Sequence, residues 1–325
     1  MAGNSDEVDG TEPVGEHWFS KPGQEILFYR VNRRPIGGEP SLFHPDPDLL
    51  AHLQRVLAPT AAATSGTRYH RTWRLGDLRF NERPESESFT GRLGWARSTE
   101  TLGQTWDSIN HGWIDRVVPK DDSGVAPVAF DARTRVLGIL KHPSFTTEPV
   151  LAKVLSQILN RGEELQDFPT TEWSVEPLGD VREFYSWLRR VDQLLILRLV
   201  FKRPNPDGEK AFDELFKRLD LYEAEQIREE IRARDMARGL NKIAVEQDEQ
   251  TQGFLTAALK YAFGRVWAKG RRKGKAVSYD QRNKVLRASI DNVGDDWNTA
   301  ADRVLREVSR RGAKQMAKLE NGETS

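Results

Sequence analysis

The sequence predicts an α+β fold: an antiparallel, β-rich N-terminal half with βαβ (ferredoxin-like) units, and a helical, basic C-terminal part. From Thr67 to about Leu140, large apolar residues alternate with polar ones, which is the two-residue period of half-buried strands. Later segments repeat apolar residues every three or four positions, as amphipathic helices do. The apolar run Leu194–Phe201 follows a predicted strand and helix, which is the order of a βαβ unit with a buried strand.

The first elements follow from local composition. Residues 25–32 are rich in aromatic and β-branched side chains and predict a strand. A helix is predicted over residues 46–57, where Asp46 can cap the first turn and Pro47 suits its start. The apolar side of this helix comprises Leu49, Leu50, Leu53, Val56 and Leu57. Within the β-rich stretch, residues 126–140 predict a hairpin that turns near Asp131–Thr134.

The period changes after residue 141, where a long helix is predicted. Thr146 or Thr147 can cap it, and Glu148 and Pro149 belong in its first turn. Its buried stripe is Val150, Leu151, Val154, Leu155, Ile158 and Leu159. The elements predicted after it are a strand at 170–177, a helix at 180–191, a buried strand at 193–201, a helix at 210–219, an exposed helix at 221–238, and helices at 250–263 and 294–316.

The length of 325 residues suits one large domain or two of ordinary size, at roughly 100–200 residues per domain. Residues 1–22 are rich in glycine, proline and acidic side chains, and they predict a flexible acidic lead-in. We divide the remainder into a β-rich α+β domain at 23–143 and a second α+β domain at 144–325. The second domain contains a basic hairpin and the C-terminal helix.

Composition excludes several classes of protein. The chain has no cysteine, which excludes disulfides, thiolate metal sites, iron–sulfur clusters and a cysteine nucleophile. The first residues lack the basic and apolar regions of a secretory signal. No apolar run approaches the roughly 18 residues that span a bilayer. We therefore expect a cytoplasmic protein without a membrane partner.

Motifs for nucleotide and hydrolase chemistry do not occur in the sequence. The patterns GxxxxGK[ST], GxGxxG and GxSxG are missing. None of the six histidines lies three or four residues from another, which is the spacing of paired metal ligands on a helix. His111 shares the parity of Asp107 and Asp115 in an alternating segment, and this pattern indicates an exposed strand face more than a metal site. We predict neither a cofactor nor a metal.

The segment Pro204–Lys210 is similar to the acid-x-Lys arrangement of metal-dependent nucleases, through Asp207, Glu209 and Lys210. Such chemistry needs carboxylates that are held rigidly around the ion, usually by a strand. Two prolines and a glycine instead predict a turn that leads into a helix. In the competing interpretation Asp207 caps that helix and Glu209 is a first-turn charge. A nuclease-like effector stays an alternative function, with no catalytic residue assigned.

The strongest candidate site is a basic hairpin near residue 270. Lys and Arg balance Asp and Glu over the whole chain, yet nine Lys or Arg occur between Arg265 and Arg287 against one acid, Asp280. The candidate ligands of a phosphate backbone are Arg265, Lys269, Arg271, Arg272, Lys273 and Lys275. Trp267 and Tyr279 can stack bases, or they can pack against each other across the hairpin. The alternative is a charged tip that only protects a hairpin edge from aggregation.

The last predicted helix carries a second basic surface. Arg303, Arg306, Arg310 and Lys314 follow steps of three and four residues, so they form one stripe opposite the side that carries Trp297. If the hairpin and this helix pack together, the two basic surfaces form one continuous footprint for nucleic acid, either DNA or RNA.

Two stretches resemble an uncharacterised family found in bacterial prophages and defence islands. They are LRLVFKRPNPDGEKAFDEL (197–215) and FGRVWAKGRRKGKAVSYDQRN (263–283). The resemblance covers the C-terminal half and implies a mobile-element or phage-defence setting, with other defence-system proteins as partners. Our leading hypothesis is a nucleic-acid-binding component of such a system. The alternatives are the nuclease-like effector and a protein–protein scaffold that uses the acidic start and basic end of the chain.

Overall fold

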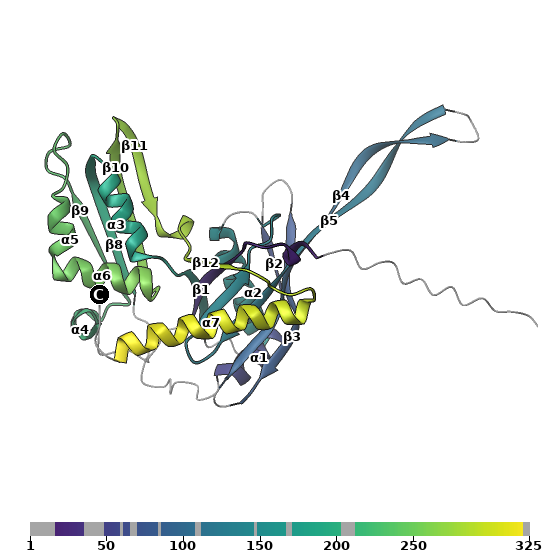
Figure 1. Ribbon diagram of the computed structural model, residues 1–325, viewed down its shortest axis with the longest axis horizontal. Helices are drawn as coiled ribbons and strands as arrows, with labels where there is room; N and C mark the ends of the chain where they lie inside the picture. The colour runs from purple at the N-terminus through teal and green to yellow at the C-terminus, as the bar shows by residue number, and fades with distance from the viewer. Residues whose placement is uncertain are drawn as a thin grey trace, which may run out of the picture.

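Two antiparallel sheets, each packed against helices, organise the chain in the computed structural model (Figure 1). The structure describes residues 17–35, 49–58, 61–65, 70–83, 86–107, 112–145, 148–166, 171–202 and 212–320. Every strand pair between described residues is antiparallel, and helices are interspersed along the chain. The predicted α+β class is therefore confirmed.

The large sheet has the strand order β12-β1-β6-β5-β4-β3-β2, and β7 also pairs with β1. Its strands are β1 (Gln24–Pro35), β2 (Ala62–Ser65), β3 (Arg71–Asn81), β4 (Ser88–Asp107), β5 (Gly112–Asp131), β6 (Val136–Leu140), β7 (Thr171–Pro177) and β12 (Arg287–Ile290). Three helices pack on it: α1 (Leu49–Leu57), α2 (Glu148–Glu164) and α7 (Trp297–Glu320). A short 3-10 turn, Trp18–Ser20, precedes β1.

Strand β1 is buried on both faces, and its alternating side chains supply two separate cores. Leu27, Tyr29 and Val31 join the core that contains α1 and α2. Ile26 and Phe28 join the core under α7. Because successive side chains of a strand point to opposite faces, one strand can serve both layers. Helices therefore cover both sides of the centre of this sheet.

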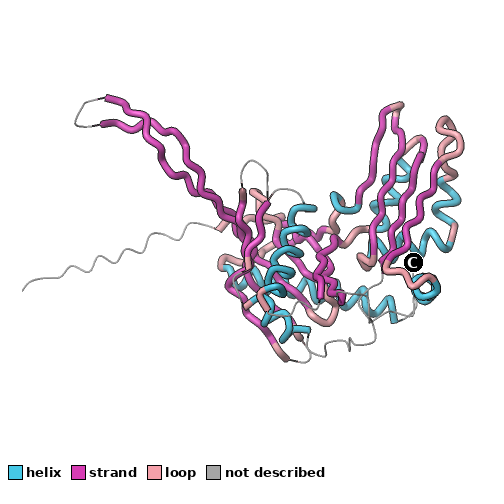
Figure 2. Tube along the Cα trace, turned by 180° about the vertical axis from the view of Figure 1, so that it is seen from behind, coloured by secondary structure: helices cyan, strands magenta, loops and turns pink. Residues whose placement is uncertain are grey.

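The small sheet has the strand order β11-β10-β8-β9. Its strands are β8 (Gln193–Lys202), β9 (Gln226–Arg232), β10 (Gly264–Arg272) and β11 (Lys275–Asp280). The helices of this part are α3 (Val181–Arg190), α4 (Asp213–Leu221), α5 (Lys242–Gln247) and α6 (Glu249–Lys260). Side chains from one face of the sheet, such as Leu199 and Val266, are buried with Phe184 of α3 and Phe254 of α6. The helices thus lie on one side of the sheet (Figure 2).

The two sheets are joined where the chain leaves β7. The Leu178 amide donates to Phe28 O at 3.0 Å, and the Gly179 amide donates to Leu259 O at 2.6 Å. The fully buried Gln281 donates from Nε2 to Pro177 O at 3.2 Å and to Ala258 O at 2.7 Å. The side-chain amide of Gln281 thus hydrogen-bonds to the backbone of β7 in the large sheet and of α6, which packs on the small sheet.

Two expectations from the sequence are corrected by the structure. The exposed helix predicted at 221–238 is replaced by β9, which forms the edge of the small sheet. Its charges pair across strands rather than along a helix, as in the contact of Glu230 with Arg198 of β8. The predicted βαβ unit is also wrong as an arrangement, because the strands on either side of α3, β7 and β8, belong to different sheets.

The predicted domain boundary at residue 144 stays a prediction, but the sheets divide elsewhere. Helix α2 and strands β7 and β12 follow that boundary and belong to the large-sheet part. The small sheet and its helices occupy the chain between β7 and β12. The small-sheet part is therefore inserted into the large-sheet part.

A long two-stranded arm extends from the large sheet (Figure 1). Strands β4 and β5 pair along their whole length, from Ser88 with Asp131 to Asp107 with Gly112. Strand β3 follows β4 only as far as Ala96, and β6 pairs with β5 only from Val128 onward. The outer half of the hairpin is thus a ribbon of two strands.

A buried carboxylate ties α2 to β7. Glu163 is 2 % exposed, and it accepts hydrogen bonds from Trp173 Nε1 and Thr171 Oγ1, each at 2.9 Å. His52 Nε2 of α1 lies 2.9 Å from the same carboxylate. Burial opposes ionisation, but the hydrogen bonds from His52, Trp173 and Thr171 outweigh it and lower the pKa of Glu163 to about 2.

This carboxylate makes a testable contribution to stability in acid. A folded-state pKa below the unfolded value gives stability above the unfolded pKa that is lost as the pH falls toward the folded pKa. We expect Glu163→Gln to lower the free energy of unfolding at pH 7 by up to about 3 kcal/mol, at about 1.4 kcal/mol per pKa unit. Its stability should also fall less steeply than that of the wild type between about pH 5 and pH 2.

Urea unfolding across this pH range measures the effect. Glu164→Gln is the matched control, because Glu164 is an exposed neighbour that pairs only with Arg161 among the described residues. Parallel pH profiles for wild type and Glu163→Gln would contradict the assignment.

Candidate nucleic-acid interface

The small sheet has one face that the helices leave uncovered, which we call the open face. Residues directly opposite each other on neighbouring strands share a face. Trp267 lies opposite Arg198 on one side and Asp280 on the other, and Arg198 lies opposite Glu230. This row runs across all four strands, and its side chains are half-buried.

Two further rows flank it. One comprises Arg228, Val200 and Arg265, and the other comprises Arg232, Ile196, Lys269 and Ser278. Lys202 and Arg271 extend the open face by strand alternation. The open face thus carries seven Lys or Arg against two acids, Glu230 and Asp280. A net positive face on a chain of zero net charge is the electrostatic pattern of a phosphate-binding surface.

Trp267 and Arg198 form the centre of the open face. The guanidinium carbon of Arg198 lies 5.2 Å from the centroid of the Trp267 ring, within the range of a cation–π contact. Arg198 Nε donates to Glu230 Oε2 at 2.6 Å, and Arg232 donates to the other oxygen of that carboxylate. These hydrogen bonds lower the pKa of Glu230. The arrangement holds the guanidinium against the indole ring.

Arg265 is less available for a ligand than the sequence suggests. Its Nη2 atom lies 2.8 Å from Asp280 Oδ2, and Arg282 binds the same carboxylate at 3.1 Å. Burial opposes ionisation of Asp280, but the hydrogen bonds from Arg282 and the charge of Arg265 lower its pKa. Arg265 and Arg282 at the β11 side of the open face are therefore both engaged by the Asp280 carboxylate.

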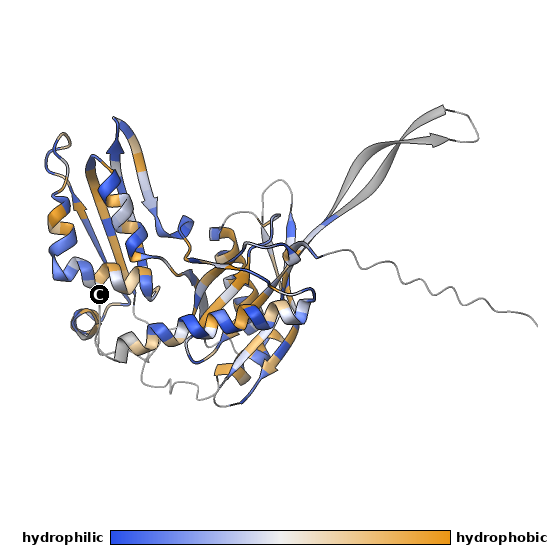
Figure 3. Ribbon diagram, in the orientation of Figure 1, coloured by the Kyte–Doolittle hydropathy of each residue, from blue (hydrophilic) through white to orange (hydrophobic). Residues whose placement is uncertain are grey.

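The tip of the β10–β11 hairpin is cationic, as the sequence predicted. Lys273 and Gly274 have positive φ values of 49° and 73°, which identify a two-residue turn of the type favoured in hairpins. The Lys273 amide donates to Asp192 Oδ2 at 2.6 Å, and the Asp192 amide donates to Arg271 O at 2.8 Å, so the turn is anchored to the start of β8. Figure 3 shows the tip as hydrophilic.

The side chains around the turn are exposed cations. They are Arg271, Arg272, Lys273 and Lys275, and none of them forms an ion pair within the described part of the chain. Lys269 and Arg228 on the open face are likewise exposed, and no described carboxylate pairs with them. These unpaired charges are the ones most available to an anionic ligand.

Tyr279 lies where it cannot meet a ligand at the surface. Its ring is 1 % exposed and packs against Phe184 and Trp187 of α3, with centroids 5.2 Å and 5.8 Å away. Tyr279 pairs with Ala268, so it points to the opposite face from Trp267. Burial raises its pKa. Neither base stacking nor a cross-strand contact with Trp267 fits this position.

The basic stripe on α7 exists, but it is separate from the hairpin. Arg303, Arg306, Arg310 and Lys314 are exposed on one side of the helix, and Arg310 binds Glu307 at 2.8 Å. Helix α7 packs along β4, β5 and β6 of the large sheet. The two views in Figures 1 and 2 place the hairpin tip at the far end of the small sheet from α7. The continuous footprint expected from packing of these two elements is not formed.

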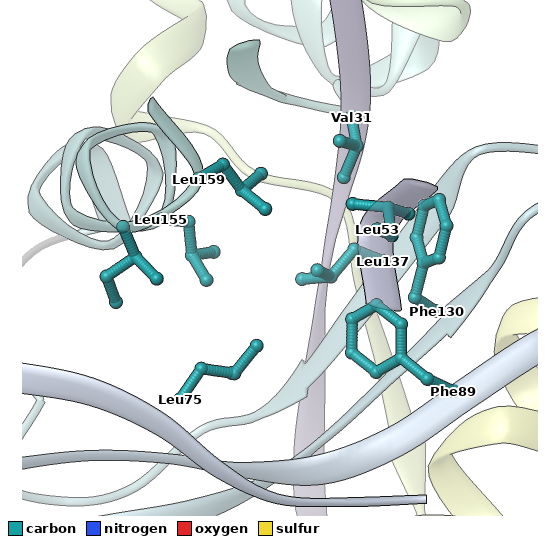
Figure 4. A pocket seen from close by; sticks show the side chains of 9 residues that line it. Val31, Leu53, Leu75, Phe89, Phe130, Leu137, Leu155 and Leu159 are labelled. Carbon is teal, nitrogen blue, oxygen red and sulfur yellow. The ribbon is translucent and has the colours of Figure 1, made fainter. Parts of the chain in front are cut away.

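The other candidates gain no support as sites. Asp207, Glu209 and His111 lie outside the described residues, and no group of three or more possible metal ligands occurs in the described part. An apolar cavity of about 10 Å³ lies between the large sheet, α1 and α2 (Figure 4). Its nine lining residues are all apolar, and its volume is close to that of one water probe. It is a packing gap of the core.

Sequence reasoning missed four cations of the open face: Arg198, Lys202, Arg228 and Arg232. The signal for the first two is local, because Ile196, Arg198, Val200 and Lys202 alternate with buried leucines and Phe201. For β9 the alternation is obscured by charges that also suit a helix.

Comparison of the chain with protein-family models and with curated proteins gave no match. None of the described helices combines the length and apolar character that crossing a bilayer requires. The resemblance to prophage and defence-island proteins and the expected cytoplasmic location stay predictions.

A pair of substitutions tests the structural role of Tyr279. The buried hydroxyl has no hydrogen-bond partner among the described residues. We therefore expect Tyr279→Phe to change the free energy of unfolding by no more than about 1 kcal/mol. Tyr279→Ala should cost about 3–5 kcal/mol, because it leaves a cavity against α3. Chemical denaturation measures both, and loss of stability in the phenylalanine variant would show a hydrogen bond that this geometry lacks.

Proposed function

We propose that the protein binds nucleic acid through the open face of the small sheet and the tip of the β10–β11 hairpin. The observation that carries this proposal is the concentration of cations there. Seven Lys or Arg occupy the open face against two acids, and Arg272, Lys273 and Lys275 surround the adjacent turn. Several of these charges form no ion pair with a described carboxylate, so binding phosphate does not require an existing pair to break.

The proposed setting is a bacterial phage-defence or mobile-element system, with other defence-system proteins as further partners. This part of the proposal rests on the resemblance of residues 197–215 and 263–283 to proteins of such systems. The proposed location is the cytoplasm, where nucleic acid of invading elements is accessible. The exposed stripe on α7 is a second, separate surface that can add non-specific phosphate contacts.

A salt series tests the role of the tip. Each neutralised phosphate contributes roughly −0.7 to −0.9 to the slope of log K against log salt. We expect the Arg271→Ala/Arg272→Ala/Lys273→Ala variant to bind labelled DNA and RNA more weakly, with a slope shallower by about 2 to 3. Fluorescence polarisation at several salt concentrations measures both quantities.

The matched control removes three arginines from the helix-covered side of the small sheet. Arg182, Arg189 and Arg190 are exposed on α3, which packs on the covered face of the small sheet. The Arg182→Ala/Arg189→Ala/Arg190→Ala variant should keep the wild-type slope. Equal slopes for the tip variant and the wild type would remove the tip from the interface.

A second candidate function, protein–protein contact, is favoured by the β4–β5 arm. An isolated two-stranded ribbon is marginally stable in water, and a partner that pairs with or covers it would stabilise it. The outer ribbon projects from the body and gains no further partner among the described strands. A docking role explains why such a segment would be retained.

Shortening the arm tests this candidate. We expect replacement of residues 98–121 by a two-residue turn to leave the thermal midpoint unchanged, because the outer ribbon pairs with no other described strand. If the arm mediates self-association, light scattering at low and high salt should give a mass above one chain for the wild type and one chain for the variant. Equal masses for the two proteins would exclude self-association through the arm.

A further inference from the structure

We infer that the open face binds single-stranded nucleic acid, with a base stacked on Trp267 and phosphates bound by the rows of cations on either side. This inference rests on the proposed function and specifies its ligand. It depends on three features of the open face: its width, the position of Trp267, and the way Arg198 is held.

The width of the open face favours a single strand over a duplex. Neighbouring strands lie about 4.8 Å apart, so four of them span about 14 Å between backbones. The major groove of B-DNA is about 12 Å wide and admits an α-helix or a two-stranded ribbon. The complete four-stranded face therefore cannot enter the groove. An extended strand with splayed bases can lie across it.

The position of Trp267 matches a stacked base between two phosphates. Successive residues on one face of a strand are about 6.7 Å apart, so the flanking rows lie at that distance on both sides of the Trp267 row. Each flanking row places an arginine or lysine beyond an aliphatic residue: Arg228 beyond Val200, and Lys269 and Arg232 around Ile196. Half-buried Val200 and Ile196 thus provide an apolar border for a base, with cations outside it.

The ion pairs of the central row prepare the ring for stacking. Glu230 holds Arg198, and the Arg198 guanidinium lies against the Trp267 ring, so the proposed base stacks on the side of the ring away from Arg198. A ring that is already fixed loses little side-chain entropy when a base binds. The two acids of the open face are each engaged by arginine, which reduces their repulsion of a phosphate chain. The unpaired Lys269 and Arg271 then indicate that the bound nucleic-acid strand runs toward the hairpin tip.

The test compares labelled (dT)20 and (rU)20 with a 20-base-pair duplex of mixed sequence, by fluorescence polarisation with the full chain. We expect the wild type to bind a single strand more tightly than the duplex. Trp267→Ala should weaken single-strand binding about tenfold, because one stacking contact is lost. The salt slope should stay unchanged, because no charge is removed. Trp267→Phe should recover most of the affinity, since it retains an aromatic face.

The controls separate this inference from the proposed function. Trp187→Phe changes a tryptophan on the covered face and should bind like the wild type. Thermal unfolding of every variant checks the fold, and Trp267→Leu replaces the alanine variant if that one unfolds. Duplex preference by the wild type, or equal single-strand affinity with and without the Trp267 ring, would overturn the inference while leaving nucleic-acid binding in place. Binding to none of the three probes would remove both proposals.

Discussion

The arrangement of the molecule depends on the backbone of one residue, Phe28. Its amide donates to Leu286 O at 3.1 Å, and its carbonyl accepts from the Leu178 amide at 3.0 Å. Leu178 is where the chain leaves the large sheet after β7, and Leu286 is where it returns to form β12. Both ends of the small-sheet part are thus hydrogen-bonded to the same residue of β1. Because β1 is buried on both faces, these attachments lie in a strand that packs into two cores.

This attachment shows how the small sheet, which carries the open face, is joined to the large one. A segment whose two ends are both attached has less freedom to rotate than one that is joined through a single linker. Gln281 adds a side-chain link between Pro177 O and Ala258 O, next to the same junction. The open face is therefore held by packing and hydrogen bonds on a defined side of the large sheet. Its rows keep their spacing because the distances along and between strands are constant in a sheet.

Features that depend on local patterns could be predicted from the sequence, and features that depend on strand neighbours could not. The hairpin tip follows from alternation on both sides of a glycine-containing turn, and the α7 stripe follows from helical spacing. For Tyr279 the sequence left base stacking and a cross-strand contact with Trp267 open, because local patterns do not determine the register of the hairpin. A two-residue turn at Lys273–Gly274 pairs Trp267 with Asp280, which sends Tyr279 to the opposite face. One residue of register decides whether a side chain meets solvent or the core.

The open face itself could not be derived from local patterns. Trp267 and Arg198 are 69 positions apart in the sequence. Glu230 lies opposite Arg198 only because β9 pairs with the edge of β8 that β10 leaves free. The charges of β9 satisfy the spacing of helix ion pairs as well as the alternation of an edge strand, so local propensity does not choose between them. Pairing with β8 decides the outcome, since it brings Arg198 to Glu230, which also accepts a hydrogen bond from Arg232 of β9 itself. The same pairing creates the cationic rows, so the fold and the candidate interface arise from one set of tertiary contacts.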